Sequence, residues 1–307
     1  MVLDDFERIL KMRFWDRVFA KLAVYHFWDW MPDSLYIRCM FHSRMGCSLN
    51  LENPKTFNEK LQWLKLHDRN PLYTELVDKA SVKDFVAKHL GDEYIIPTLG
   101  VWENFDQIDF DKLPDQFVLK CTHDSGGLVI CRDKSKLNID EARQKINKSL
   151  KNRYFYHGRE WPYKNVPPRI IAEKYMEDES GGFVDYKFFC FNGVVDCVMV
   201  CIDRHIHDTK FYFFDKDWNL KRLNIRGKNA PADFTLRKPS CMDQMFEIAA
   251  KLSKGIPYVR VDLYEVKGRV YFGEMTFFPD NGFDSNLLPE TDLYFGNLID
   301  LTKMENK

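Results

Sequence analysis

Two acidic residues near the C-terminus occur in strand-like segments, where a carboxylate is unfavourable unless a cation or strong hydrogen-bond donors compensate it. The alternating pattern predicts two strands joined by a turn at Lys267-Gly268, and these strands carry Asp262 and Glu274. Oxygen ligands on rigid strands suit Mg²⁺ that also contacts a phosphate. The pair is therefore a candidate Mg²⁺ site, and an ordinary salt bridge from Arg260 to one of the acids is the alternative.

The geometry of the turn decides whether both acids can share one ion. A three-residue loop over 266–268, with glycine in the left-handed conformation, would set Glu274 opposite Arg260. Both acids would then point to the same side of the hairpin. A two-residue turn would place them on opposite faces, so the metal hypothesis requires the longer loop.

A second group of residues suits phosphate binding. A short apolar strand predicted over 116–120 ends in Lys120 and leads into the loop Ser125-Gly126-Gly127. Lysine supplies a point charge, and flexible glycine backbone supplies N–H donors, which are the groups that nucleotide phosphates need. The lysine precedes the glycines, so the motif is not a Walker loop. The same loop is also compatible with a plain hairpin turn.

Lys79 is a further candidate phosphate ligand. It is predicted to begin a helix that Asp78 caps and Gly91 ends. A lysine at a helix start is disfavoured by the helix dipole, so a nearby anion would explain its position. A solvated surface lysine is the alternative.

These polar residues occur in a characteristic order: the lysines first, then Glu173-Lys174 and Asp185, and then the two acids of the hairpin. In this order the chain resembles the TupA-like (teichuronopeptide-type) ATP-grasp proteins of bacterial polysaccharide gene clusters. The resemblance extends over most of the chain and includes residues 53–63, 78–79, 113–121, 159–163, 170–175, 185–188 and 274–277.

The resemblance implies that the protein uses ATP and Mg²⁺, and it assigns residues to each. The implied phosphate-binding residues are Lys79 and Lys120, the latter also catalytic, under a lid of Ser125, Gly126 and Gly127. The implied adenine hinge is Glu173, Lys174, Tyr175 and Met176, with Asp185 at the ribose and Lys187 also at the nucleotide. The implied Mg²⁺ ligands are Asp262, Glu274 and Thr276, with Arg260 steadying a phosphoryl intermediate. Many ATP-grasp ligases carry Asn where this chain has Thr276, so a fully coordinated second Mg²⁺ is not implied.

The implied fold is α/β, with two α+β ATP-grasp subdomains that clamp ATP and a helical N-terminal region. The expected regions are 1–66 (helical N-terminal region), 67–115 (pre-ATP-grasp region), 116–168 (small subdomain) and 169–307 (C-terminal subdomain with the metal site). The implied reaction joins a uronic acid of a capsular or O-antigen polysaccharide, or its precursor, to an amino acid through an acyl phosphate. A glycosyltransferase-like enzyme and a catalytically silent glycan-binding protein are the alternatives.

The segment before the hinge has no evident place in nucleotide binding, so it is a candidate substrate site. If it is extended, Arg159 and Trp161 point to the same side, where the arginine could bind a carboxylate and the indole could stack on a sugar. Arg204 is a rival carboxylate-binding residue, and the loop 279–282 is the next alternative. The purely structural alternative is a loop held by an Arg159 salt bridge and buried aromatic residues.

Composition narrows the remaining classes. The chain of 307 residues has a net charge of −1, so no global field favours nucleic acid. Its eight cysteines include no CxxC pair, which indicates reduced thiols in a cytoplasmic protein. No signal peptide or membrane span is expected. The aromatic stretch 14–31 is expected to pack as a helical cap, or else to rest on the inner face of the membrane beside polysaccharide machinery.

Overall fold

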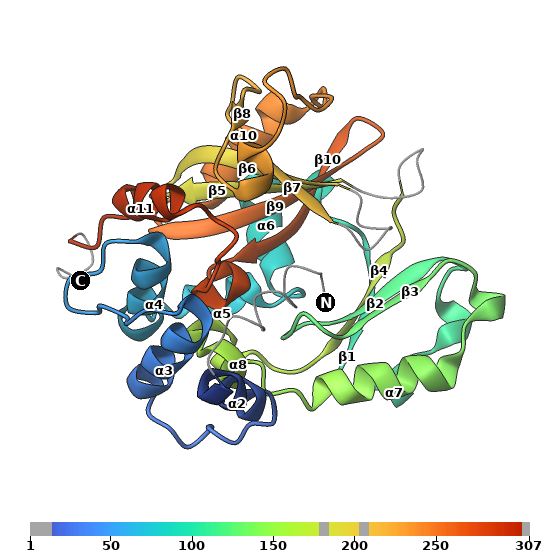
Figure 1. Ribbon diagram of the computed structural model, residues 1–307. Helices are drawn as coiled ribbons and strands as arrows, with labels where there is room; N and C mark the ends of the chain where they lie inside the picture. The colour runs from blue at the N-terminus through green and yellow to red at the C-terminus, as the bar shows by residue number, and fades with distance from the viewer. Residues whose placement is uncertain (1–13, 178–183, 203–208, 303–307) are drawn as a thin grey trace.

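The computed structural model describes residues 14–177, 184–202 and 209–302, which form two antiparallel sheets flanked by helices (Figure 1). The strand order is β1-β4-β2-β3 in the four-stranded first sheet and β10-β9-β5-β6-β7-β8 in the six-stranded second sheet. The strands are β1 (Thr98–Trp102), β2 (Phe117–Cys121), β3 (Leu128–Cys131), β4 (Ile170–Lys174), β5 (Asp185–Phe191), β6 (Val194–Ile202), β7 (Lys210–Phe214), β8 (Leu220–Lys221), β9 (Tyr258–Val266) and β10 (Arg269–Thr276). The α/β class expected from the sequence is confirmed.

Helices lie on both sheets and at the N-terminal end of the described chain. They are α2 (Phe14–Val24), α3 (Asp33–Met45), α4 (Phe57–His67), α5 (Leu72–Val77), α6 (Val82–Leu90), α7 (Ile139–Leu150), α8 (Phe155–Gly158), α9 (Ile225–Lys228), α10 (Met242–Leu252) and α11 (Pro289–Leu298). Short 3-10 helices that matter for the site are η5 (Trp161–Asn165) and η7 (Pro279–Gly282).

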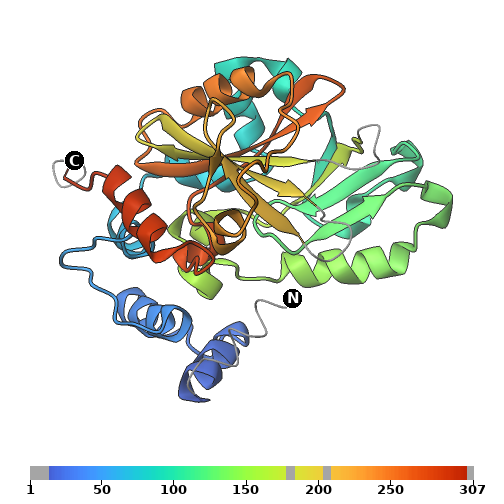
Figure 2. The ribbon, with the colours of Figure 1, turned by 45° about the horizontal axis from the view of Figure 1, so that its top comes forward.

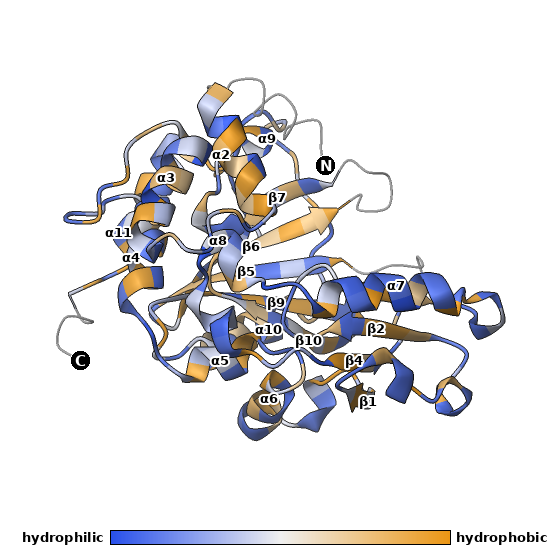
Figure 3. Ribbon diagram, turned by 90° about the horizontal axis from the view of Figure 1, so that it is seen from below, coloured by the Kyte–Doolittle hydropathy of each residue, from blue (hydrophilic) through white to orange (hydrophobic). Residues whose placement is uncertain are grey.

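The first sheet buries one face against α7 and turns its other face toward the second sheet. In β2, Phe117 and Leu119 are buried in the core that includes Ile146 of α7, whereas Lys120 points to the opposite face. Coloured by hydropathy, α7 carries hydrophilic residues along its length, as a helix exposed on one side should (Figure 3). This sheet includes β1 and β4, so it extends on both sides of the expected range 116–168.

The second sheet is covered on both faces, and β5 is buried along its whole length. On one face, Phe188 packs edge-on against Phe246 of α10, with ring centroids 5.1 Å apart. On the other face, Phe189 stacks on Phe295 of α11, with centroids 5.4 Å apart. Burial of aromatic residues on both faces explains why this strand reads as a continuous apolar run.

Polar residues occupy the other end of the face that α11 covers. Asp185 and Lys187 share this face with Phe189 because side chains alternate along a strand. The neighbouring strand β9 places Asp262 directly opposite Lys187. One face of the sheet thus has an apolar half under helices and a polar half left for chemistry.

The N-terminal helices form a separate small core, to which Phe283, the residue after η7, also contributes. Trp28 stacks on Phe19 of α2 with ring centroids 5.0 Å apart, and α3 contributes Ile37 to the same core. The expected packing of this stretch on the main body is found, and α2 and α3 lie at one end of the molecule (Figure 2). Several aromatic side chains of the stretch remain exposed, namely Phe14, Trp15, Tyr25, Phe27 and Trp30. No helix among the described residues is long and apolar enough to cross a membrane.

No disulfide joins any of the eight cysteines, and six of them are buried. Within the ranges that the structure describes, no group of three or more His, Cys, Asp or Glu side chains is arranged to hold a metal ion. That the thiols are reduced in the cell stays a prediction from the sequence.

Candidate functional site

A cavity of about 270 Å³ opens between the two sheets, and charged side chains converge on it. Its basic residues are Lys79, Lys83, Lys120 and Lys187, and its acidic residues are Asp124, Glu173, Asp185 and Glu274. Ser125 and Gly127 of the predicted phosphate loop also line it. Several lysines around one space are costly unless anions balance them, so the cavity suits a strongly anionic ligand.

Of the two connections that the sequence left open, the β9–β10 hairpin has the two-residue turn and not the three-residue loop that the metal hypothesis required. Val266 pairs with Arg269, which leaves Lys267 and Gly268 as the turn, with φ of 53° and 74°. Two successive left-handed residues form the turn type that matches the twist of a hairpin. This turn alone would have placed the two acids on opposite faces.

A bulge at Gly273 restores the shared face. Phe272 pairs with Leu263, but the next pair is Glu274 with Asp262, so Gly273 is the extra residue. A Cβ at Gly273 would lie 2.9 Å from the backbone oxygen of Asp262, which only glycine avoids. The acids therefore lie directly opposite each other, as the metal hypothesis requires, but by a different route.

Asp262 is buried in an ionic cluster. The Arg260 Nε and Nη2 atoms donate to its two carboxylate oxygens at 2.7 and 2.8 Å. The Lys187 ammonium contacts the same carboxylate and lies 3.4 Å from Asp185. Burial would raise the pKa of Asp262, but Arg260 and Lys187 lower it below its ordinary value. The carboxylate is therefore held charged inside the protein.

Glu274 and Thr276 complete the group at the cavity side of the hairpin. The Arg260 guanidinium donates to Thr276 Oγ1 at 3.1 Å and lies 3.6 Å from the Glu274 carboxylate. The Thr276 hydroxyl in turn lies 3.5 Å from Glu274 Oε1. Arg260 thus lies against both acids and the hydroxyl, where it can neutralise charge on a transferring phosphoryl group.

The residues fit Mg²⁺ shared with a phosphate better than a metal held by protein alone. Asp262, Glu274 and Thr276 offer hard oxygen donors on one face, but only two of them are carboxylates. Mg²⁺ needs six oxygen ligands and commonly takes several from water and substrate phosphates. The predicted ligands Asp262, Glu274 and Thr276 are therefore brought together in a set that suits this ion.

Glu173 of β4 lies between two lysines. Its two carboxylate oxygens lie 2.5 Å from Lys83 Nζ and 2.5 Å from Lys120 Nζ. Burial would raise the pKa of Glu173, but the two ammonium groups lower it. Lys83, which also donates to the backbone oxygen of Ile96 at 2.8 Å, was missed in the sequence. Its spacing of four residues from Lys79 was the available signal.

The rest of the predicted hinge does not line the cavity. Lys174 is exposed, and its backbone N–H donates to the Pro97 oxygen at 2.9 Å. The Tyr175 hydroxyl accepts from Arg132 Nε at 3.0 Å, and Met176 is half-buried. Because side chains alternate along β4, Glu173 turns toward the cavity and Lys174 turns away.

Lys79 lies in a turn, because α6 begins three residues later than predicted. The carboxylate of Asp78 accepts from Ala80 N at 3.0 Å, and its backbone oxygen accepts from Val82 N at 3.0 Å. The Lys79 ammonium donates to the backbone oxygen of Asp124. Burial lowers the pKa of Lys79 below its ordinary value. The residue is a half-buried member of the cavity rather than a solvated surface lysine.

Asp124, which the sequence did not single out, holds the phosphate loop. One of its carboxylate oxygens accepts the backbone N–H groups of Gly126 and Gly127 at 3.3 and 3.2 Å. The other accepts from the Ser149 hydroxyl and from Asn152 Nδ2. The carboxylate thus occupies two amides that were expected to bind phosphate, and a phosphate would have to replace it there.

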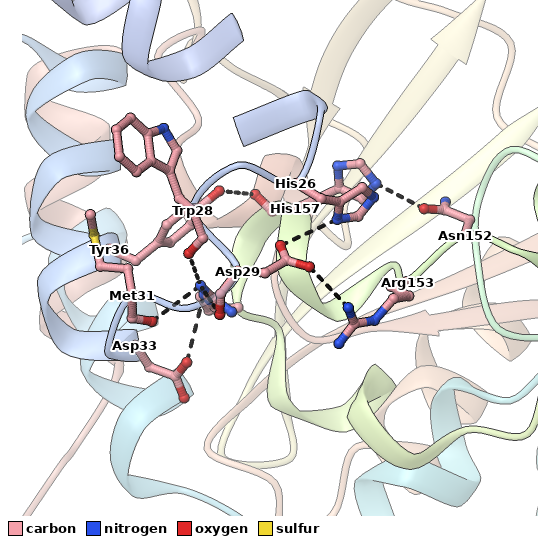
Figure 4. A network of polar contacts seen from close by, with 10 residues as sticks. His26, Trp28, Asp29, Met31, Asp33, Tyr36, Asn152, Arg153 and His157 are labelled. Atoms are coloured by element: carbon pink, nitrogen blue, oxygen red, sulfur yellow. Dashed lines mark hydrogen bonds and ion pairs between the residues drawn. The ribbon is translucent and has the colours of Figure 1, made fainter. Parts of the chain in front are cut away.

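Arg159 has a structural role, contrary to the substrate hypothesis. Its backbone is left-handed, with φ of 55°, so the segment is not extended. Its buried Nη2 donates to the backbone oxygens of Trp28 at 2.8 Å and Met31 at 3.3 Å. Trp28 and Met31 are among the residues labelled in Figure 4. Its guanidinium lies 4.5 Å from the centre of the Tyr36 ring, and its Nε lies 3.6 Å from Asp33. These contacts tie α8 to the segment between α2 and α3.

The other two substrate candidates are not brought to the cavity by the described structure. Trp161 begins the 3-10 helix η5 and is half-buried, and it does not line the cavity between the sheets. Arg204 lies outside the described residues. The alternative loop 279–282 forms η7, which begins three residues after the end of β10.

Comparison with known proteins gives a family and several structures of low similarity. The profile of the TupA-like ATP-grasp family matches residues 59–300. None of the curated proteins matches the chain. The D-alanine–D-alanine ligase of Bacillus anthracis, complexed with ATP, is 14% identical, with 76% of this chain and 67% of that chain covered and a TM-score of 0.46. The D-alanine–D-alanine ligase of Helicobacter pylori is 15% identical, with 80% of this chain and 69% of that chain covered and a TM-score of 0.42. The D-cycloserine synthetase DcsG is 16% identical, with 77% of this chain and 72% of that chain covered and a TM-score of 0.41.

The family match covers most of the chain and includes every residue of the cavity. The matched range contains Lys79, Lys120, Glu173, Asp262 and Glu274, in the order in which the sequence analysis took them. The ATP-grasp fold class follows from it, as does the enzyme class of ATP-dependent ligase. The chain belongs to the TupA-like ATP-grasp family.

Proposed function

We propose that this protein is an ATP-dependent carboxylate–amine ligase that works with Mg²⁺. Its proposed substrates are a uronic acid of a bacterial capsular or O-antigen polysaccharide, or its precursor, and an amino acid. The observation that carries the proposal is the placement of Glu274 opposite Asp262, with Arg260 against both. This is an arrangement for neutralising a phosphoryl group, and it lies at the edge of a lysine-lined cavity.

The chemistry requires activation of the carboxylate, because a carboxylate is a poor electrophile and its oxide is a poor leaving group. Transfer of the γ-phosphoryl group to a carboxylate oxygen breaks a P–O bond of ATP and yields an acyl phosphate and ADP. The amine then attacks the acyl carbon, loses a proton, and expels inorganic phosphate. The products are an amide, ADP and phosphate.

The residues of the cavity divide between positioning and charge neutralisation. Lys79 and Lys120 would hold the phosphates, and Lys187, which now contacts Asp262, could turn to a phosphate when Mg²⁺ occupies the acids. Bound Mg²⁺ would neutralise phosphate charge beside Asp262 and Glu274. Arg260 would hold the acyl phosphate oxygens, since it already faces the hydroxyl and both acids.

The nucleotide base and ribose would lie on the hinge side of the cavity. Glu173 and Asp185 line the cavity, where they would bind adenine and the ribose. The backbone of 174–176, which lies outside the cavity lining, would receive adenine only after moving toward it. The glycine loop at Gly126 would close over the phosphates once they replace the Asp124 carboxylate at its amides.

The proposal extends to where the enzyme works. A cytoplasmic location at the inner face of the membrane, near membrane-associated polysaccharide machinery, follows from the proposed substrate. The exposed aromatic side chains of the N-terminal segment, including Trp15 and Trp30, support peripheral contact of this kind.

A coupled assay of ADP release tests the proposal against its alternatives. The protein is incubated with Mg²⁺, ATP, a panel of uronic-acid glycans and a mixture of the proteinogenic amino acids, with each component omitted in turn. ADP release that needs both the uronic acid and an amino acid supports the ligase. Release of a nucleotide from a sugar nucleotide without ATP would support a glycosyltransferase, and glycan binding without turnover would support a binding protein.

A further inference from the structure

A second cavity, of about 240 Å³, lies between helices α3 and α8 and the segment that follows β10. Arg44 of α3 and His157 of α8 line one side, and Asp280, Asn281 and Asn286 line the other. The lining is mostly polar and brings a cationic and an anionic side chain to one small space. Neither the nucleotide nor the metal site described above uses these residues.

The wall that contains Asp280 and Asn281 is held in an unfavourable backbone conformation. These two successive non-glycine residues have φ of 48° and 55°, both in the left-handed region. The buried Lys65 ammonium donates to the Asn281 oxygen at 2.6 Å, and Gln62 Nε2 donates to the Gly282 oxygen at 2.5 Å. Backbone strain of this kind persists where surrounding groups enforce it, and it clusters at sites that bind or react.

The second cavity lies a short stretch of chain beyond Thr276, the last of the proposed metal ligands. Asp280 follows Thr276 by four residues, which limits their separation to about 14 Å even if the chain is extended. Buried Glu160 interacts electrostatically with both Asp280 and Arg260. The two cavities share no lining residue, so an amine bound at Asp280 would have to move toward Arg260 before it reacts.

The opposite wall is connected to the phosphate loop. The His157 ring nitrogen Nε2 lies 2.9 Å from Asn152 Oδ1, and Asn152 Nδ2 donates to Asp124 at 3.3 Å. Figure 4 shows His157 and Asn152 within the polar network that also ties down the N-terminal segment. The backbone oxygen of Asp124 also accepts a hydrogen bond from the Lys79 ammonium. Asp124 therefore contacts both this wall of the second cavity and the phosphate-binding lysine.

We propose that the second cavity binds the amino-acid substrate of the ligase, a small zwitterion with a free carboxylate. Arg44 would bind its α-carboxylate, and Asp280 would attract its ammonium group before the amine is deprotonated. The volume suits a single small molecule rather than a polysaccharide segment. The inference rests on the proposed function, since it assigns one of the two substrates of that reaction.

Kinetics of two variants test the assignment, with the amino acid that supports turnover of the wild type as the varied substrate. Arg44→Met removes the cation, and Asp280→Asn removes the charge while keeping a residue that tolerates the left-handed conformation. Each should raise KM for the amino acid by about tenfold or more, and KM for ATP and for the uronic acid should stay unchanged. Arg237→Met, at an exposed arginine outside both cavities, is the matched control and should leave all three values unchanged.

Three results would overturn the assignment: unchanged KM for the amino acid in both variants, an increase in KM for the uronic acid instead, or an equal change in the control. If the wild type forms no ADP with any substrate pair, the proposed function fails first. Direct titration of the proteinogenic amino acids into the wild type with Mg²⁺ and ADP then decides the cavity separately. Binding that Arg44→Met abolishes would uphold it, and no binding to the wild type would refute it.

Discussion

Glu274 lies directly opposite Asp262 in the β9–β10 ladder because Gly273 is bulged out of it. The two-residue turn at the end of the hairpin sets one register, and the bulge shifts that register by one residue on the side of the cavity. A one-residue shift moves every later side chain to the other face. The candidate metal site therefore depends on one glycine as much as on its two acids.

Replacing Gly273 with alanine should damage the site without touching a charged residue. The new Cβ would meet the Asp262 backbone oxygen at 2.9 Å and the Tyr264 ring at 2.8 Å, so the bulge must shift. We expect a loss of about 1–3 kcal/mol in the free energy of unfolding and a large loss of ADP release. Urea unfolding and the coupled assay measure both. Full activity in Gly273→Ala would show that the bulge does not position the acids.

The two acids should differ in what their loss does to stability. Glu274 is half-exposed on the cavity, so Glu274→Gln should abolish turnover and leave the free energy of unfolding nearly unchanged. Asp262→Asn should also abolish turnover, but it leaves Arg260 and Lys187 buried without their shared anion. It should therefore lower the free energy of unfolding by about 3–5 kcal/mol. Equal stability of the two variants would contradict the ionic cluster, and turnover in both would remove the metal hypothesis.

ATP binding should take up a proton at Lys79. In the free protein, burial lowers the pKa of Lys79, so its ammonium group loses its proton at a lower pH than that of an exposed lysine. A bound phosphate favours the ammonium and raises that pKa, so binding takes up a proton at pH values between the lowered and the raised pKa. Titration calorimetry in two buffers of different ionisation enthalpy measures the uptake. Lys79→Met should lack this proton, and equal uptake in wild type and variant would contradict the assignment.

Arg159 should matter for stability rather than for substrate kinetics. Replacing it with methionine removes the guanidinium donor from the backbone oxygens of Trp28 and Met31, and Trp28 keeps only the bond from the Met31 N–H. The free energy of unfolding should fall by about 2–4 kcal/mol, and KM for the uronic acid should not change. Denaturant unfolding beside steady-state kinetics checks this. A stable variant with a raised KM for the sugar would return Arg159 to the substrate site.

The sequence predicted the fold class and the cavity residues better than the local backbone that positions them. The order of Lys120, Glu173 and Asp262 along the chain identified the family, since charged residues in apolar strands require partners. The bulge at Gly273 was not predictable, because a single glycine in an alternating strand does not show where the pairing of the two strands shifts. Lys83 was missed because its partner Glu173 is remote in sequence. For Arg159 the sequence left a substrate role and a structural role open, because burial of an arginine among backbone oxygens leaves no local pattern, and the structure shows the structural role.

The closing of the glycine loop over phosphate is a prediction from the sequence. The amides of Gly126 and Gly127 now donate to Asp124, and the sequence predicted that they would hold phosphate. Both are satisfied if the two amides release the Asp124 carboxylate and bind a phosphate of ATP in its place. The exchange requires the loop to move, which is why its residues are glycines.

The fate of a labelled carboxylate oxygen tests the central claim most directly. The uronic acid is prepared with ¹⁸O in its carboxylate, turned over with ATP, Mg²⁺ and the amino acid, and the released phosphate is analysed by mass spectrometry. An acyl phosphate intermediate predicts one labelled oxygen in the inorganic phosphate for each amide formed, with ADP as the nucleotide product. Unlabelled phosphate, or AMP in place of ADP, would contradict the account.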